Sequence, residues 1–502
     1  MNKSNKQFKN SDFIFLFAGQ QGHYALFNSL TCQVFYGKEN LSLLYAHFSD
    51  WNSLQGIKGN RKISKGIIQK LIDEKFLIST SDVDLGEMSV MQEKARRKRG
   101  IKTLYLSLTH RCNFRCEYCL DRKSIAVGRK KDLDMSVETA RLAADYYLKS
   151  VQPEIDKEVV FYGGEPLLNY RTLVFLTNYI QTQESKKQRV NPGYKKSRFI
   201  LCTNGSLIDS KVALFLKEND IYPAVTLDGE AETHNTVRRS QGNHGTHNKV
   251  RENIEKLHQQ GCPVGVSLTL GKHNISKLPQ ILGFFAEEVK PQTVATNVLV
   301  NYEGAENNQY CCDPGELAKG LVGAYKTARE RGIYLVKYVM DNRIKPFVER
   351  TPRINGCTGI GSRIMVLPDG SVTICAAFAQ RASVKLQDNP SLADFIPDGI
   401  SNYSPFLRKE CRGCYAISCC GGGCPRSAED KHGTIFAQDD DYCFQSRYIL
   451  RWLIWDLFEF VDRKKIRTQG YVIPSMSDRR KVYGEIKVRR TPLDFQYTPN
   501  AK

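Results

Sequence analysis

Six short apolar runs alternate with amphipathic stretches through the middle of this 502-residue chain, and this alternation limits the possible folds most strongly. The runs lie at 104–108, 159–162, 199–201, 224–227, 264–270 and 294–300. Strands that alternate with helices predict βαβ units and a parallel sheet. Six repeats are too few for a full eight-stranded barrel. We therefore expect an α/β fold, with a partial (β/α)6 TIM-like barrel over 101–350.

The residues before this core form a separate small unit, predicted over 1–90. It shows, in order, a hairpin, two amphipathic helices and a short strand, at 13–17 with 24–27, 41–48, 64–75 and 76–78. This order predicts a winged-helix-like unit. The basic tract 94–99 is predicted to follow it as a charged linker.

After residue 350 cysteine and glycine dominate, and we expect a Cys-rich domain over 351–450. A C-terminal helix and a basic tail are expected over 451–502. The apolar stretch 448–461 carries Arg451, Asp456 and Glu459, so it predicts a buried helix and no membrane span. Without a secretory signal, the protein is expected to be cytoplasmic and not membrane-bound.

The amino-acid composition further limits the class of protein and its possible partners. With 41% hydrophobic and 25% charged residues, the chain is typical of a globular protein, which excludes disordered and fibrous classes. Sixteen unevenly spread cysteines in a reducing compartment indicate metal or redox chemistry, because structural disulfides are rare there. The net charge of +20 suits an acidic polypeptide, a nucleic acid or anionic small molecules as partners, or simply a solvated basic surface.

Three cysteines directly follow the first apolar run, in the spacing Cys112-x3-Cys116-x2-Cys119. Three thiolates on one loop can each hold one iron of a [4Fe–4S] cube and leave the fourth iron open. An open metal position is where chemistry can occur. The loop also leaves the carboxyl end of a strand, where barrel active sites lie. A structural zinc site is the alternative, but adjacent His110 is its only candidate fourth ligand.

This loop resembles the hallmark of the radical S-adenosylmethionine (SAM) superfamily, including the aromatic Tyr118 before the third cysteine. The resemblance implies that Cys112, Cys116 and Cys119 are catalytic and ligate a [4Fe–4S] cluster. It also implies that the open iron binds SAM, whose reductive cleavage gives a 5′-deoxyadenosyl radical that abstracts a substrate hydrogen.

Further motifs stand at the ends of later predicted strands. Glycines allow a close backbone approach, and a neighbouring carboxylate can accept from an ammonium group. Gly-Gly-Glu-Pro resembles the family motif for the SAM amino group, and the Thr-Asn-Gly and Asp-Gly loops resemble those around its ribose and carboxylate. For the Thr-Asn-Gly and Asp-Gly loops the alternative is an ordinary turn with no role in binding, because these residues are common in turns. The implied SAM-binding residues are Tyr118, Gly163, Gly164, Glu165, Pro166, Thr203, Asn204, Asp228 and Arg238, with Arg239 an alternative to Arg238.

Seven cysteines in the C-terminal region form a second set: Cys357, Cys375, Cys411, Cys414, Cys420, Cys424 and Cys443. Seven thiolates need two sites, because zinc ions and cubanes each take at most four protein ligands. The spacing resembles the SPASM domain of radical SAM enzymes that modify peptides and proteins. That resemblance implies two auxiliary [4Fe–4S] clusters, one on Cys411, Cys414, Cys420 and Cys443, the other on Cys357, Cys375 and Cys424.

The second set departs from that pattern at two positions. Arg363 stands where the eight-cysteine form has a further ligand, so an open iron on the inner cluster is expected unless another residue supplies a ligand. Ala376 stands where sulfatase-maturing relatives have a catalytic aspartate. Cys419, next to Cys420, is a spare that could enter the ligand set. The remaining cysteines lack ligand spacing: Cys32, Cys202, Cys262, Cys311 and Cys312.

Together these features resemble maturases of ribosomally made peptides (RiPPs). The resemblance implies that a precursor peptide docks its leader on the N-terminal unit as an added strand. It also implies a thioether or carbon–carbon cross-link as product, and a reductant such as flavodoxin or ferredoxin. One alternative is modification of a folded protein partner. From another class, a zinc-stabilised nucleic-acid-binding protein would use the basic tracts 94–99 and 479–490, but it leaves the three-thiolate loop unexplained.

Overall fold

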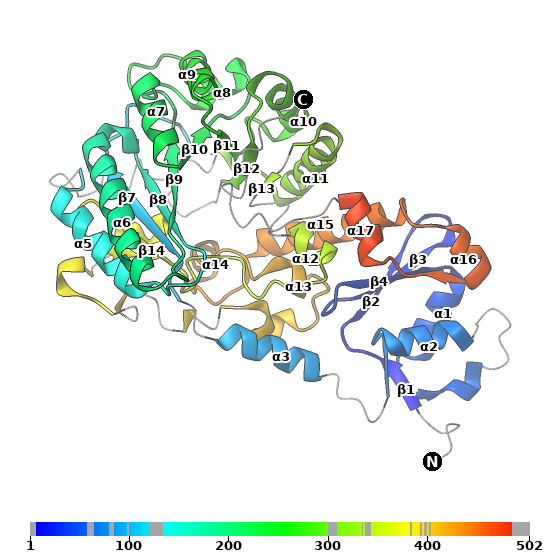
Figure 1. Ribbon diagram of the computed structural model, residues 1–502. Coiled ribbons are helices and arrows are strands. Elements are labelled where there is room, and N and C mark those ends of the chain that lie inside the picture. The colour runs from blue at the N-terminus through cyan, green and yellow to red at the C-terminus, as the bar shows by residue number, and fades with distance from the viewer. Residues whose placement is uncertain are drawn as a thin grey trace.

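A computed structural model gives the fold of this chain. It describes residues 7–57, 65–79, 85–97, 100–119, 134–299, 309–333, 335–336, 343–381, 384–391, 394–395, 399–400 and 403–483. Helix α15 (Asp440–Phe458) lies between the central sheet, with its covering helices, and the N-terminal unit (Figure 1). None of the helices in these ranges is long and apolar enough to cross a membrane.

All six apolar runs form neighbouring parallel strands. They are β7 (Thr103–Thr109), β8 (Glu158–Gly163), β9 (Arg198–Thr203), β10 (Ile221–Thr226), β11 (Gly265–Leu270) and β12 (Thr293–Val298). The predicted α/β class with a parallel sheet is therefore confirmed. The strand count was too low, because the sheet gains strands at both edges.

One edge gains β13 (Leu335–Val336), parallel to β12, and the other gains β14 (Arg363–Val366), parallel to β7. A final strand, β15 (Val372–Thr373), pairs antiparallel with β14. The described sheet therefore runs β13-β12-β11-β10-β9-β8-β7-β14-β15, an open order whose ends do not meet. Strand β14 escaped prediction because its partner β7 lies far away in the sequence.

Helices join successive strands and cover the sheet (Figure 1). The crossover helices are α5 (Val137–Ser150), α6 (Tyr170–Val190), α7 (Ser210–Glu218), α8 (Ala231–Val237), α9 (His247–Gln259), α10 (Leu278–Phe284) and α11 (Pro314–Arg331). Ser136 and Asp209 cap α5 and α7, each accepting a backbone N–H with its side chain. Such caps satisfy donors that a helix leaves unpaired at its start.

The N-terminal unit contains every predicted element and several more. The hairpin is β2 (Ile14–Ala18) with β3 (Tyr24–Asn28), and the other predicted elements are α1 (Glu39–His47), α2 (Lys65–Asp73) and β6 (Leu77–Ser79). The additional strands are β1 (Gln7–Asn10), β4 (Gln33–Gly37) and β5 (Asn52–Ser53). They form two described sheets, of order β5-β1-β6 and β16-β4-β3-β2.

The basic tract 94–99 was wrongly predicted to be a linker throughout. Its residues up to Arg96 end helix α3 (Leu85–Arg96). This helix forms because Met88 and Ala95 bury their side chains, and Gln92 donates to the carbonyl of Phe406 at 3.2 Å. Residues 98–99 lie outside the described ranges.

The expected basic tail is also partly folded. It contains α16 (Lys464–Gln469), β16 (Tyr471–Val472) and α17 (Met476–Tyr483), and β16 pairs antiparallel with β4. Arg479 is buried and donates to Phe347 O and to Gln33 Oε1. That side chain is therefore not part of a solvated basic surface. Residues 484–502 lie outside the described ranges.

Short helices lie in the Cys-rich region, namely α13 (Ile417–Cys420) and α14 (Pro425–His432), and α12 (Lys345–Val348) directly precedes that region. The long α15 follows, as the apolar stretch 448–461 predicted, and buries Leu450, Leu453 and Leu457. Tyr36 of β4 packs on Trp455 and Phe458 of this helix. Helix α15 thus ties the N-terminal unit to the rest of the fold.

Candidate functional site

The first cysteine loop, residues 112–119, is clamped by the segment that follows α8. Backbone N–H groups of Arg115 and Glu117 donate to the carbonyls of Arg239 and Val237, at 2.8 and 2.9 Å. Gln241 Nε2 donates to the carbonyls of Cys112 and Phe114, at 3.1 and 3.0 Å. These hydrogen bonds hold the backbone of the loop against that segment.

The Gly-Gly motif ends β8 directly against this loop. Gly163 has φ +131°, and a Cβ there would lie 2.4 Å from the carbonyl oxygen of Thr109. At Gly164 a Cβ would lie 2.2 Å from the carbonyl oxygen of Arg111. Both positions need glycine, since any side chain would push the loop away.

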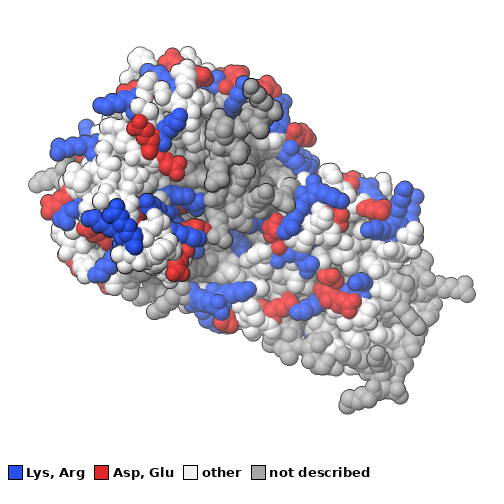
Figure 2. Space-filling model, viewed as in Figure 1, with Lys and Arg blue, Asp and Glu red and all other residues white. Residues whose placement is uncertain are grey.

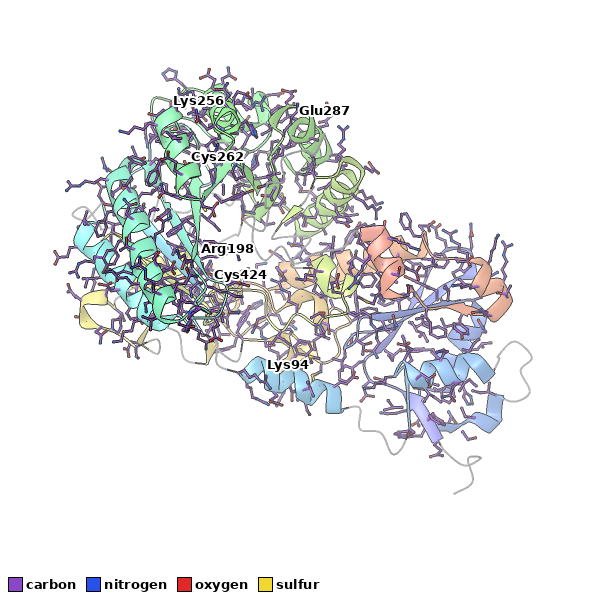
Figure 3. All side chains as sticks on the ribbon, in the orientation of Figure 1. Lys94, Arg198, Lys256, Cys262, Glu287 and Cys424 are labelled. Carbon is purple, nitrogen blue, oxygen red and sulfur yellow. The ribbon has the colours of Figure 1, made fainter. Side chains whose placement is uncertain are left out.

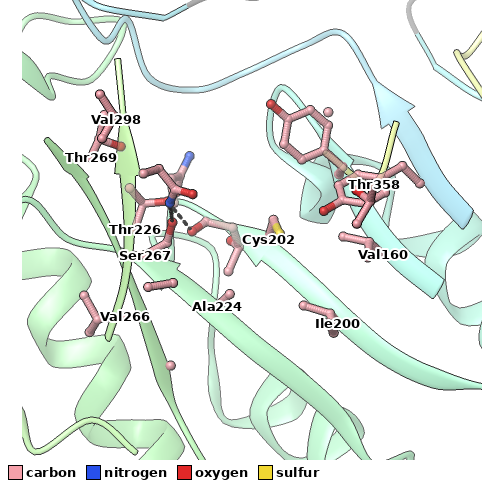
Figure 4. A pocket seen from close by; sticks show the side chains of 18 of the residues that line it. Val160, Ile200, Cys202, Ala224, Thr226, Val266, Ser267, Thr269, Val298 and Thr358 are labelled. Atoms are coloured by element: carbon pink, nitrogen blue, oxygen red, sulfur yellow. Dashed lines mark hydrogen bonds between the residues drawn. The ribbon is translucent and has the colours of Figure 1, made fainter. Parts of the chain in front are cut away.

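A cavity of about 730 Å³ opens at these strand ends. Side chains from β8 to β12 and Thr358 surround it (Figure 4). Among the predicted site residues, its lining includes Cys112, Cys116, Tyr118, Cys119, Gly163, Gly164, Thr203, Asn204, Arg238 and Cys357. Glu165, Pro166 and Asp228 lie behind the lining, and Arg239 instead donates to the carbonyl of Asn235.

Glu165 is completely buried, and its carboxylate ties two motifs together. It accepts from Thr203 Oγ1 at 2.7 Å, from Asn204 N at 2.8 Å and from Leu167 N at 3.2 Å. Burial raises the pKa of Glu165, whereas these hydrogen bonds lower it. The oxygens of Glu165 thus hold the Thr-Asn-Gly loop in place beside the cavity.

Three buried polar side chains connect the cysteine loop to the end of β10. Arg238 Nη1 donates to the Tyr118 hydroxyl at 2.6 Å, and that hydroxyl donates to Asp228. Asp228 also accepts from Thr269 N at 2.9 Å. Burial disfavours the charge of Arg238, but Cys116, Tyr118 and Asp228 outweigh it and raise its pKa above the ordinary value.

The seven cysteines of the second set fall into two groups in space. Burial, together with Cys414, Cys443 and Cys411, raises the pKa of Cys420 to about 12. Burial likewise raises the pKa of Cys424, with Cys357 and Cys375 adding to the effect. The two ligand sets that the sequence resemblance implies stay a prediction.

The sulfur of Cys419 lies 3.8 Å from that of Cys32, and both Cys32 and the adjacent Cys420 raise the pKa of Cys419. Cys262 lies among the sheet-covering helices, apart from Cys424 (Figure 3). Within the described residues, no three His, Cys, Asp or Glu side chains converge to hold a single metal ion. In a cubane each thiolate binds a different iron.

Sequence reasoning missed Gln241 and Asn113. Asn113 accepts from Asn204 Nδ2 at 2.9 Å and donates to Ser206 Oγ at 2.8 Å, which joins the cysteine loop to the Thr-Asn-Gly loop. Gln241 follows α8 in a segment without a motif. The only signal for either residue is proximity in the folded chain.

Comparisons with known proteins find similar sequences and similar folds. Fe-coproporphyrin III synthase of Methanosarcina barkeri is 23% identical over 372 residues, which cover 68% of this chain and 87% of that protein. The solved structure of native anSMEcpe with bound AdoMet and Kp18Cys peptide has a TM-score of 0.60 at 20% identity, covering 72% of this chain and 98% of that one. The solved structure of Streptococcus suis SuiB bound to precursor peptide SuiA has a TM-score of 0.51 at 14% identity, covering 87% of this chain and 99% of that one.

The family model of the radical SAM superfamily matches residues 106–285. That segment runs from β7 into the helices after β11 and contains the cysteine loop, both glycines and Arg238. The match and the clamped three-cysteine loop together establish the class: this chain belongs to the radical SAM superfamily and is a radical SAM enzyme.

Proposed function

We propose that this chain is a peptide maturase that uses radical SAM chemistry to cross-link a ribosomally made precursor peptide through a thioether or a carbon–carbon bond. One observation carries the proposal. The cavity at the first cysteine loop is also lined by Cys357 of the second set, with Arg353 and Thr358 beside it. A substrate in that cavity therefore lies between the SAM site and a proposed auxiliary cluster.

The residues present fit a [4Fe–4S] cluster and SAM. Cys112, Cys116 and Cys119 all line the cavity and can ligate three irons. Arg238 lines it too, and its Nε has no hydrogen-bond partner among the described residues. A buried guanidinium N–H without a partner is costly unless an acceptor such as the SAM carboxylate binds there. When bound, the cluster and SAM supply a carbon radical able to remove hydrogen from an unactivated C–H bond.

The chain's own residues bind and orient these groups. Gly163 and Gly164 bring backbone carbonyls to the cavity, where they can accept from the SAM ammonium group. Tyr118 and Asp228 fix Arg238 in one orientation. Below them, Val160, Ile200 and Val266 form an apolar floor that excludes water from the reacting carbon.

The second cysteine set is proposed to hold two auxiliary [4Fe–4S] clusters. The support is the spatial grouping of Cys411, Cys414, Cys420 and Cys443, and of Cys357, Cys375 and Cys424. Held by these thiolates, such clusters would supply electron-transfer chemistry beside the cavity. A protein such as flavodoxin or ferredoxin would supply the electron for SAM cleavage.

The N-terminal unit is proposed to hold the leader peptide. Its four-stranded sheet ends at β2, which pairs only with β3 among the described strands. A peptide can add to such an edge through backbone hydrogen bonds. SuiB, which covers 87% of this chain, binds a precursor peptide. The net charge of +20 would attract an acidic leader.

Two observations weigh against the other candidates. Basic and acidic side chains are interspersed on the face shown in Figure 2, so that face has no continuous basic surface for nucleic acid. Arg479, in the basic tract that a nucleic-acid-binding protein would use, is buried and cannot contact nucleic acid. Ala376, at the position of the sulfatase-maturase aspartate, packs against Met365 and Leu367 and offers no general base.

Co-expression with candidate precursor peptides tests the proposal. Each cross-link should lower the peptide mass by two hydrogens, and a Cys116→Ala enzyme should leave the mass unchanged. Supplying core peptide without its leader should abolish the shift, and leader added as a separate peptide should restore part of it. A porphyrin substrate, a folded protein substrate, or zinc in place of about twelve irons per chain would overturn the proposal.

A further inference from the structure

Helix α15 has one solvent-facing side, which we call the α15 face. Its residues are Phe444, Arg447, Tyr448 and Arg451. They share one side of the helix because residues three or four positions apart are neighbours on a helix surface. Tyr448 is half-buried and the other three are exposed, whereas the opposite side of the helix is buried in the main hydrophobic core.

The amino-terminal end of the α15 face leads to the proposed active site. One turn before Phe444, Asp441 lines a second cavity, of about 940 Å³. Tyr105, Cys357 and Thr358 line both this cavity and the one at the first cysteine loop, so the two cavities share a wall. A peptide that leaves the first cavity through the second therefore meets the α15 face next.

The other end of the α15 face leads to the N-terminal unit. One turn after Arg451, Trp455 lies against Gly19, where a Cβ would be 2.2 Å from the indole ring. Gly19 directly follows β2, the strand at the edge of the four-stranded sheet. The α15 face thus runs from the end of the strand proposed to receive the leader to the cavities proposed to receive the core peptide.

The two arginines give this face an unbalanced positive charge. Neither Arg447 nor Arg451 forms an ion pair or a side-chain hydrogen bond with another residue that the structure describes. The nearby Asp441 does not neutralise them, because it pairs with Lys431 at 2.7 Å. Exposed guanidinium groups without a partner are suited to bind carboxylates from another molecule.

The aromatic residues give the same face an apolar surface. The rings of Phe444 and Tyr448 stack with their centroids 6.4 Å apart and an interplanar angle of 24°. Phe444 is 44% exposed, which is unusual for so large an apolar side chain. Flat aromatic surfaces of this kind pack well against the side chains of a bound peptide.

The length of the helix sets the length of the segment that fits. From Asp441 to Trp455 the helix rises about 21 Å, at 1.5 Å per residue. An extended peptide rises about 3.3 Å per residue, so about six residues span that distance.

We propose that the α15 face binds an acidic, extended segment of the precursor peptide, which connects the leader on β2 to the core peptide in the cavities. The inference rests on the proposed function and deepens it, because it states where the precursor lies between the two sites and which chemistry that segment carries. Glutamate or aspartate side chains of the segment pair with Arg447 and Arg451, and apolar side chains pack on Phe444 and Tyr448.

The first test measures binding of a synthetic probe to the full-length chain. The probe is a fluorescent peptide of alternating glutamate and leucine, and the same peptide with glutamine in place of glutamate is its neutral counterpart. In fluorescence anisotropy, the double variant Arg447→Glu/Arg451→Glu should bind the acidic probe about tenfold more weakly than the unaltered chain, because two ion pairs are replaced by repulsion. Binding of the neutral peptide should not change.

A matched control separates the α15 face from the overall basic charge. Arg171 and Arg189 of α6 are also exposed and have no ion-pair partner among the described residues. Arg171→Glu/Arg189→Glu makes the same change in net charge and should leave binding of the acidic probe unaltered. Equal weakening in the two double variants would overturn the inference, because net charge alone would then attract the probe.

The second test locates the bound probe. The photoreactive residue p-benzoylphenylalanine in place of Phe444 should cross-link to the acidic probe on irradiation. The control carries this residue in place of Leu214 on α7, which is also 44% exposed and lies outside the α15 face. Cross-linking of equal yield at the two positions would contradict binding at α15.

Failure of the proposed function looks different from failure of this inference. With a precursor that loses two hydrogens, Arg447→Glu/Arg451→Glu should raise KM about tenfold and leave kcat unchanged, since these arginines bind the precursor away from the reacting atoms. An unchanged KM would overturn the role of the α15 face and leave the proposed cross-linking intact. The absence of a two-hydrogen loss from every candidate precursor would overturn the proposed function, whatever the probe shows.

Discussion

The two cysteine regions are held in opposite ways. The first loop receives hydrogen bonds from Gln241 and from backbone after α8, and rests on a parallel sheet. Much of the second set lies on or beside short elements, where α13 has four residues and α14 has eight, and Cys443 is in the first turns of the long α15. Between Cys420 and Cys424 three successive glycines have positive φ. The sheet therefore shapes the first site, whereas the second would depend for its shape on the auxiliary clusters that we propose.

The largest expected difference between the two cysteine regions follows replacement of a proposed cluster-ligating cysteine. Cys420→Ala should remove a cluster and destabilise the Cys-rich region by on the order of 5 kcal/mol or more, as loss of a structural metal does. Cys116→Ala should also lose about four irons yet keep its thermal unfolding temperature. Iron analysis with limited proteolysis of residues 403–443 would measure the contrast. Equal protease resistance in both variants would contradict it.

A smaller effect distinguishes two buried carboxylates near opposite ends of β9. Glu165 accepts from Thr203 and Asn204, whereas Glu184 accepts from Ser197 N and Oγ at 2.8 and 2.7 Å. Replacing either with glutamine turns an amide N–H toward donors and should cost about 1–3 kcal/mol.

Only Glu165→Gln should also weaken SAM binding, since only Glu165 supports a loop of the cavity. Denaturant unfolding and SAM titration of both variants measure the two effects. Comparable SAM affinities in the two variants would show that Glu165 has no role beyond stability.

Acidification should affect the sheet region through buried histidines. Burial lowers the pKa values of His234, His247 and His273, and Arg238 lowers that of His234 further. A histidine with a lower pKa in the folded state contributes stability above its unfolded pKa, near 6.5, and this stability is lost as the pH falls below it.

The free energy of unfolding should therefore fall between pH 7.5 and 5.5, by up to about 1.4 kcal/mol per histidine and pH unit. The unfolding temperature should fall with it. His247→Gln should flatten this dependence, and His244→Gln, at an exposed position, should not. An unchanged slope in His247→Gln would exclude this histidine as a source.

The smallest effect concerns an ion pair at the first loop. Arg111 and Asp134 lie 2.6 Å apart, but both side chains are more than a third exposed. Asp134→Asn should cost at most about 1 kcal/mol, and salt should reduce that cost. Unfolding at low and high ionic strength would reveal it. A larger loss would mean that this pair helps to shape the first loop.

Local patterns predicted much of the fold, and distance in sequence explains the failures. The six runs and the hairpin were recognisable because each forms from a continuous apolar segment. Strands β14 and β16 were missed because each has few residues and pairs with a partner hundreds of positions away. In the sequence Arg479 lies in a charged tail, but its contacts with Phe347 and Gln33 form only when the chain folds.

The site shows the same limit. Cysteine spacing and Gly-Gly-Glu-Pro led to the cavity, because those motifs are local in sequence. Gln241 and Asn113 have no motif and are identified only by their contacts in the folded chain. The direction of the Glu165 carboxylate, toward Thr203 and Asn204, also needed the structure.

Strand β16 has a consequence for how the enzyme is made. Val472 pairs with Tyr36, so the sheet proposed to receive the leader takes its last strand from nearly the far end of the described chain. Domains usually fold as they emerge from the ribosome, amino-terminal end first. The sheet of this unit is nevertheless completed late, because β16 is translated after almost every other described element. A nascent chain would then engage precursor peptide only once the catalytic sheet behind it exists.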